Sequence, residues 1–190
     1  MTRRHQPVCI EQPDWLFDVL DLQRVYITQQ QRMALAIKLS AHNVKQGGGP
    51  FGACVFDMQD HTLIAAGVNR VEQAGLSVAH AEMIALMQAQ RHLQSWTLDA
   101  EGLPDCELVT SSEPCVQCFG GIYWSGIKQL VCGAYKSDVM GLGFDEGPRP
   151  DDWIDSLLKR GVAVKTGIMR DAAVEVLHRY KDAGGLIYNP

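Results

Sequence analysis

The sequence predicts a mixed α/β domain, in which helices cover a central sheet. Short apolar runs bounded by turn residues alternate with segments whose apolar residues recur every three or four positions. The 190 residues contain no internal repeat or low-complexity linker, and their 46% hydrophobic content suffices for one sizeable core. We therefore expect a single domain at 28–190, preceded by an N-terminal extension at 1–27.

The first half of this domain predicts helix, strand, strand, helix. Thr28 and Gln31 form the pattern of a capping box, and Met33 and Ile37 continue one apolar face until the glycines at 47–49. Strands are expected at 51–57 and 62–69, because both runs are apolar and the segment between them is polar. Residues 80–93 return to helical spacing.

The second half continues the alternation. Strands are predicted at 106–111, 128–134 and 162–168, and helices at 115–126, 151–160 and 171–183. Asp151 and Asp152 suit the first turn of their helix, where carboxylates oppose the positive end of the helix dipole. The glycine-rich segment 141–150 is expected to be a loop, and residues 184–190 form a tail.

Charge and composition exclude several classes of protein. The net charge is −5, and residues 51–150 carry five basic against twelve acidic side chains. A nucleic-acid partner is not expected, because such proteins present basic surfaces. No segment has the apolar length of a membrane span or a signal peptide. These absences predict a cytoplasmic protein without membrane association, whose six cysteines are core residues or metal ligands.

One cysteine pair has the spacing of metal ligands. Cys115 and Cys118 form C-x-x-C at a predicted strand-to-helix junction, where backbone N–H groups favour the thiolate. His80 lies at a second such junction and supplies a third donor. Three protein ligands predict one zinc ion per chain, with water or hydroxide as its fourth ligand. Glu82, two residues beyond the histidine, is then placed to transfer protons beside the metal.

Two simpler interpretations compete with this one. A redox C-x-x-C would leave His80 and Glu82 without a role. A structural zinc site completed by Cys54, Cys106 or Cys132 is the stronger rival, although these three cysteines otherwise resemble buried strand residues. The combination H-A-E followed by P-C-x-x-C favours the catalytic interpretation, because it is the general signature of zinc deaminases.

With these motifs, the chain resembles the cytidine deaminase-like superfamily, and the segment 113–127 resembles its purine-acting branch. The resemblance implies a three-layer α/β/α sandwich around a five-stranded mixed sheet. It also implies that His80, Cys115 and Cys118 bind zinc and that Glu82 is the proton shuttle. The segments "PFGACVF", "GVNR", "GLGFDEGPRP" and "GLIYNP" are similar to bacterial guanine deaminases, some of which accept aminotriazines such as ammeline.

The same resemblance implies a substrate site and a dimer. Asn69 would hydrogen-bond the base, Glu146 would contact the reacting edge of the purine as a second catalytic carboxylate, and His80 would adjoin the base. The aromatic residues Phe51, Trp124 and Phe144 would line or close the pocket. The implied subunit arrangement is a homodimer.

The predicted reaction is hydrolysis of guanine to xanthine and ammonia. Hydroxide would attack C2 of guanine while Glu82 protonates the adjacent ring nitrogen, and no organic cofactor is needed. The alternatives are a tRNA adenosine deaminase, a deaminase of guanosine or cytidine, and a zinc-stabilised binding module without turnover.

Overall fold

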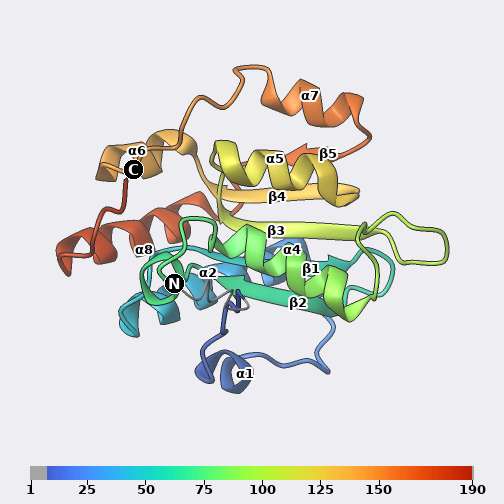
Figure 1. Cartoon of the computed structure of the whole chain (residues 1–190), viewed down its shortest axis with the longest axis horizontal. Coiled ribbons are helices and arrows are strands. Elements are labelled where there is room, and N and C mark those ends of the chain that lie inside the picture. The colour runs from blue at the N-terminus through green and yellow to red at the C-terminus, as the bar shows by residue number, and fades with distance from the viewer. Residues whose placement is uncertain (1–7, 190) are drawn as a thin grey trace, which may run out of the picture.

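The computed structural model describes residues 8–189 and confirms a three-layer α/β/α fold (Figure 1). Its five strands form one sheet in the order β2-β1-β3-β4-β5. Strand β1 runs antiparallel to both β2 and β3, whereas β3, β4 and β5 are mutually parallel, so the sheet is mixed as expected. The strands are β1 (Gly52–Asp57), β2 (Leu63–Val68), β3 (Cys106–Ser112), β4 (Gln129–Ala134) and β5 (Ala163–Lys165).

Helices cover both faces of this sheet, as Figure 1 shows. Buried residues of α2 and α8 belong to the core on one face, and those of α4, α5 and α7 belong to the core on the other. The helices in the described residues are α1 (Trp15–Val19), α2 (Gln29–Lys45), α3 (Val71–Ala74), α4 (Ala81–His92), α5 (Val116–Ser125), α6 (Lys136–Leu142), α7 (Trp153–Lys159) and α8 (Arg170–Asp182).

Strand β1 shows why its segment of the sequence is a continuous run of apolar residues. Cys54 and Phe56 point into the core beneath α2 and α8, while Ala53 and Val55 point into the core beneath α4 and α5. Successive side chains of a strand alternate between faces, and here both faces are covered. Every position of the strand interior therefore has to be apolar.

The predicted elements are confirmed, with boundaries that shift by a few residues. Helix α2 begins at the predicted capping box, in which Thr28 accepts from the Gln31 backbone and Gln31 accepts from the Thr28 backbone. Asp151 and Asp152 were expected in the first turn of α7, but they lie just before it, because the helix begins at Trp153. Asp152 is the N-cap of α7, and Asp155 is the acidic residue of its first turn.

Three short helices, α1, α3 and α6, were not predicted from the sequence. Helices α1, α3 and α6 are five, four and seven residues long, which is too short to reveal a 3.6-residue period. Helix α6 takes the first two residues of the loop expected at 141–150 and ends at Leu142, with Gly143 as its C-cap at a φ of 113°. The remaining residues, 143–150, form the loop that carries Glu146.

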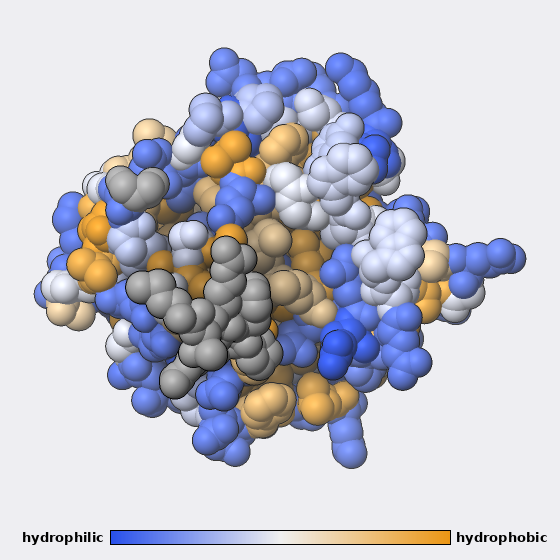
Figure 2. All heavy atoms as spheres, viewed as in Figure 1, coloured by the Kyte–Doolittle hydropathy of each residue, from blue (hydrophilic) through white to orange (hydrophobic). Residues whose placement is uncertain are grey.

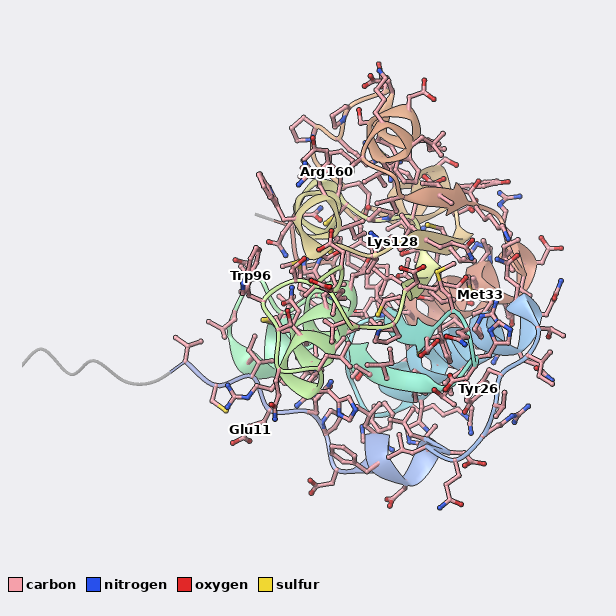
Figure 3. The ribbon with its side chains drawn as sticks, turned by 90° about the vertical axis from the view of Figure 1, so that its right-hand side faces the viewer. Glu11, Tyr26, Met33, Trp96, Lys128 and Arg160 are labelled. Carbon is pink, nitrogen blue, oxygen red and sulfur yellow. The ribbon has the colours of Figure 1, made fainter. Side chains whose placement is uncertain are left out.

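The segment before α2 packs along the sheet edge. The Gln12 side chain donates to the carbonyl of Ala66, 2.8 Å away, and Val25 forms an isolated bridge with Thr62. Tyr26, which is labelled in Figure 3, is buried. Its ring centroid lies 5.4 Å from that of Phe56. The division of the chain at residue 28 stays a prediction, and residues 1–7 of that extension lie outside the described part.

The surface drawn in Figure 2 is mixed in character. Hydrophobic residues on this face form small groups set among hydrophilic ones. Across residues 8–189, none of the helices combines the length and the apolar character needed to cross a membrane.

Candidate active site

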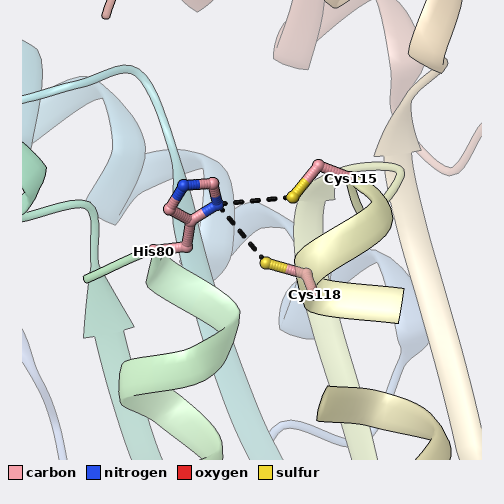
Figure 4. A group of neighbouring side chains, drawn as sticks. All are labelled: His80, Cys115 and Cys118. Atoms are coloured by element: carbon pink, nitrogen blue, oxygen red, sulfur yellow. Dashed lines mark hydrogen bonds between the residues drawn. The ribbon is translucent and has the colours of Figure 1, made fainter. Parts of the chain in front are cut away.

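Two helix N-termini bring three metal-binding side chains together, as predicted from the motifs. His80 is the N-cap of α4 and Cys115 is the N-cap of α5, while Cys118 lies one turn further along α5. The His80 Nδ1 atom lies 3.5 Å from the Sγ of Cys115 and 3.5 Å from the Sγ of Cys118 (Figure 4). All three donor atoms lie within 4.8 Å of one another.

Close packing against the sheet fixes the helix that carries His80. A Cβ atom added at Gly67 of β2 would lie 2.5 Å from the carbonyl oxygen of Ala81, so the first turn of α4 needs a glycine beneath it. Because this turn also carries Glu82, the same contact sets the height of both side chains above the sheet.

The local environment favours one thiolate in the cluster. A hydrogen bond from Cys118, supported by His80, lowers the pKa of the Cys115 thiol to about 4. Burial by itself lowers the pKa of His80, but the hydrogen bond and charge of Cys115 outweigh it and raise that pKa. The shared hydrogen bond with Cys115, together with burial, raises the pKa of Cys118 well above its usual value.

These donors fit a zinc ion. One imidazole nitrogen and two sulfurs are typical zinc ligands, and three protein ligands leave one position open. Among residues 8–189, His80, Cys115 and Cys118 are the group of three or more donors close enough to hold a metal. Cys54, Cys106 and Cys132 lie elsewhere in the sheet, and burial raises the pKa of each thiol. This arrangement favours an open site over a zinc site closed by a fourth cysteine.

A cavity of about 480 Å³ adjoins the donor cluster and is lined by His80 and Cys115. Predicted site residues from four segments line it: Phe51 before β1, Asn69 after β2, Glu82 in α4, and Phe144 with Glu146 in the loop after α6. The volume is suited to a small heterocycle. No lysine or arginine among the described residues lines this cavity.

Two buried carboxylates face the cavity. Glu82 is 5% exposed, and burial together with the charge of Cys115 raises its pKa. Glu146 is 6% exposed, and burial raises its pKa to about 8, with contributions from the charges of Cys115 and Glu82. Two carboxylates and a thiolate thus repel one another around one space. A divalent cation there would offset this repulsion, which is a second reason why zinc fits.

Asn69 is held rigidly at the cavity wall. It is 2% exposed, and its Oδ1 accepts from the backbone N–H of Val71 at 3.2 Å. The side chain of Asn43 donates to the carbonyls of Asn69 and Gly49, at 2.9 and 2.8 Å. The Asn69 side-chain N–H groups are donors that a ligand's acceptor atoms can use.

Comparison with known proteins agrees with this geometry. The family profile described as the cytidine and deoxycytidylate deaminase zinc-binding region matches residues 27–134, more than half of the chain. The chain belongs to this deaminase family.

Individual deaminases of known structure extend the similarity beyond the zinc-binding region. The structure of guanine deaminase from Nitrosomonas europaea superposes with a TM-score of 0.91 at 45% identity, covering 95% of this chain and 100% of that one. The protein NE0047, in complex with 2,6-diaminopurine, gives a TM-score of 0.91 at 47% identity over 96% and 97% of the two chains. Guanine deaminase from Bacillus subtilis is 39% identical over 58% of this chain and 67% of its own length.

One predicted pocket residue lies outside the cavity of this deaminase chain. Trp124 is 72% exposed on α5, beside Tyr123 and beneath the guanidinium of Arg160, which lies 4.9 Å from its ring. Helical geometry explains the difference, because Cys118 and Ile122 face the core and Trp124 is about 200° further round the helix from Ile122. Within one chain, the expected pocket role of Trp124 is therefore not met.

The C-terminal tail contributes cavity residues that the sequence analysis did not assign. Tyr188 and Asn189 line the cavity, and the Tyr188 ring lies 5.1 Å from that of Phe144. Asn189 donates to the carbonyl of Gly143 and accepts from the backbone of Asp145, which ties the tail to the Glu146 loop. The tail shows no periodic pattern that could have predicted a role in the cavity. Its resemblance to guanine deaminases in the segment "GLIYNP" was the one indication in the sequence.

Proposed function

We propose that this protein is a zinc-dependent guanine deaminase that hydrolyses the free base to xanthine and ammonia. The observation that carries the proposal is similarity to guanine deaminase over almost the whole chain, combined with Asn69, Glu82 and Glu146 around one cavity. The complex of NE0047 with a diaminopurine further supports a purine as the ligand.

The metal-binding part of the proposal rests on the donor cluster. His80, Cys115 and Cys118 would hold one zinc ion, with Nδ1 as the histidine ligand atom. When bound, zinc supplies a Lewis acid next to the substrate and makes water a stronger acid.

The two carboxylates would divide the proton transfers. Glu82 takes a proton from the attacking water and delivers it to the ring nitrogen on one side of C2 of guanine. Glu146 serves the other flank, where it accepts the N1 proton or helps to pass a proton to the leaving amine. Burial raises the pKa of both carboxyls above the usual glutamate value, and a raised pKa suits both directions of transfer.

The remaining cavity residues would bind and orient the base. Asn69 donates to acceptor atoms of the purine, and the rings of Phe51 and Phe144, 5.4 Å apart in an edge-to-face contact, cover it. Phe144 also lies against Tyr180 and Tyr188, which stabilises its position.

An ammonia-release screen tests this function directly. Purified zinc-loaded protein is assayed against guanine, guanosine, adenine, cytosine, cytidine and ammeline. We expect turnover of guanine above all, with ammeline as a secondary substrate. Turnover confined to a nucleoside or to cytosine would contradict the proposed substrate, and no ammonia from any compound would favour the binding module.

A tRNA adenosine deaminase is the second candidate, because the E-P-C-x-x-C segment resembles both branches. The acidic balance of residues 51–150, and the absence of lysine and arginine among the residues of 8–189 that line the cavity, argue against it. We expect no tRNA binding at physiological salt, and a salt-sensitive mobility shift at micromolar protein would revive this alternative.

We also propose a homodimer that works in the cytoplasm. Trp96 and Trp124 are 86% and 72% exposed, and contact with a second subunit would cover such side chains (Figure 3 labels Trp96). The six free cysteines suit a reducing compartment. Light scattering tests the subunit number, and we expect Trp124→Ser to shift a dimer toward the monomer.

A further inference from the structure

A buried arginine links the loop that carries Glu146 to the turn that carries Cys115. Arg149 Nη1 donates to the carbonyl of Pro114 at 2.7 Å, and Arg149 Nη2 donates to the carboxylate of Glu113 at 2.8 Å. The two acceptors belong to the segment immediately before Cys115, whereas the arginine lies three residues after Glu146. One guanidinium thus bridges two segments that are more than thirty residues apart in sequence.

The partner carboxylate is held from a second direction. Glu113 Oε2 also accepts from the backbone N–H of Lys136, at 3.1 Å, and the Lys136 ammonium donates to the carbonyl of Gly147, at 3.1 Å. Glu113 and Lys136 therefore form a second connection between the cysteine turn and the residue that follows Glu146. The Glu146 carbonyl itself accepts from Val116 N–H at 2.9 Å.

The Arg149 side chain is buried and held in one position by its neighbours. The Arg149 and Glu113 side chains are 5% and 11% exposed, and the guanidinium lies 4.1 Å from the ring centroid of Trp153. The planar fork of arginine allows one side chain to satisfy two acceptors while stacking on an aromatic ring. A lysine keeps the charge but cannot reproduce this fork.

We propose that Arg149, together with Glu113, is a positioning residue for Glu146. The pair holds the Glu146 carboxylate at a set distance from the Cys115 turn and hence from the reacting edge of the substrate. This inference rests on the proposed deaminase function and on the proposed role of Glu146. Arg149 does not line the cavity, whereas Glu113 does, so the arginine acts through the loop and through Glu113 rather than by touching the base.

The physical reason is the sensitivity of proton transfer to distance. Loop residues 143–147 include two glycines with positive φ, Gly143 and Gly147. Asn189 holds the first part of this loop, at Gly143 and Asp145, whereas Arg149 and Lys136 hold the part that follows Glu146. A displacement of about 1 Å can cost on the order of 100-fold in rate. Hydrogen bonds from Arg149 and Lys136 therefore restrain the loop on the C-terminal side of Glu146.

The test is a double-mutant cycle on guanine turnover with Arg149→Lys and Glu146→Gln. In the wild-type background we expect Arg149→Lys to lower kcat by about 10- to 100-fold, with KM changed much less and zinc retained. In the Glu146→Gln background, Arg149→Lys should lower kcat by no more than about twofold, because the group that it positions is already gone. Equal losses in both backgrounds would overturn the proposal and leave Arg149 with a structural role.

Two further variants keep the result interpretable. Arg32→Lys is the matched control, since Arg32 is also buried and donates to a carboxylate, Glu107, and to a backbone carbonyl, that of Tyr26, but none of these residues lines the cavity. We expect its kcat to equal that of the wild type. If Arg149→Lys does not fold, Trp153→Leu, which removes the ring that the guanidinium packs on and does not line the cavity, is assayed in the same cycle, and again only non-additivity with Glu146→Gln supports the proposal. Wild-type protein inactive on guanine would instead contradict the proposed function.

Discussion

Replacing Glu146 by glutamine should stabilise the metal-free protein at pH 8 and at the same time lower guanine turnover. The carboxyl is 6% exposed and lies near the charges of Cys115 and Glu82, and its pKa is raised from 4.5 to about 8. Glutamine has nearly the same shape without the charge. The ionised Glu146 is destabilised in the folded state by burial and by repulsion from Cys115 and Glu82, but not in the unfolded chain. The Glu146→Gln variant removes this cost and so raises the free energy of unfolding.

The sign and size of this effect follow from proton linkage. Below pH 4.5, Glu146 is protonated in both states, and its ionisation costs no stability. As the pH rises from 4.5 to about 8, the unfolded chain releases the proton while the folded chain retains it, so the free energy of unfolding falls. At about 1.4 kcal/mol per pH unit, the loss approaches about 5 kcal/mol by pH 8 and stays constant above it.

Urea denaturation of chelator-treated wild type and Glu146→Gln at several pH values measures this difference. We expect the variant to gain stability relative to wild type between pH 4.5 and 8, and the gain to shrink when zinc is bound, because the cation offsets the negative charge. Zinc-loaded Glu146→Gln should release ammonia from guanine on the order of 100-fold more slowly. A pH-independent difference in stability, or near-normal kcat, would refute the reasoning.

The remaining predictions concern the shuttle, the metal and the core. Glu82→Gln should keep zinc but lose about 10²- to 10⁴-fold in kcat, measured by ammonia release alongside metal content. Cys115→Ala should lose zinc, whereas Cys132→Ala should retain it; equal zinc loss in both would revive the four-cysteine site. Arg32→Met should lower the free energy of unfolding by about 3–5 kcal/mol in urea, because Glu107 then stays buried without its partner, and a change below about 1 kcal/mol would contradict this.

The elements with a strong local pattern were predictable from the sequence. Strands covered on both faces are mostly apolar, and helix α2 carries both a capping box and a periodic face, so a short stretch of sequence is enough to identify each of them. The donor types and their C-x-x-C and H-x-E spacing likewise predicted the cluster of His80, Cys115 and Cys118, because short-range spacing at two helix starts constrains where the side chains point.

Relations between distant segments were decided only by the tertiary structure. Trp124 shows this most clearly. It lies on the same helix as Cys118 of the metal site, but its position around the helix axis places its side chain on the surface. Tyr188 enters the cavity from a tail without any periodic pattern, and Arg149 reaches the Cys115 turn across a loop. Local sequence determines what a segment becomes and which chemistry it carries. Packing determines which segments meet, because the contacts that fix them are spread over the whole chain.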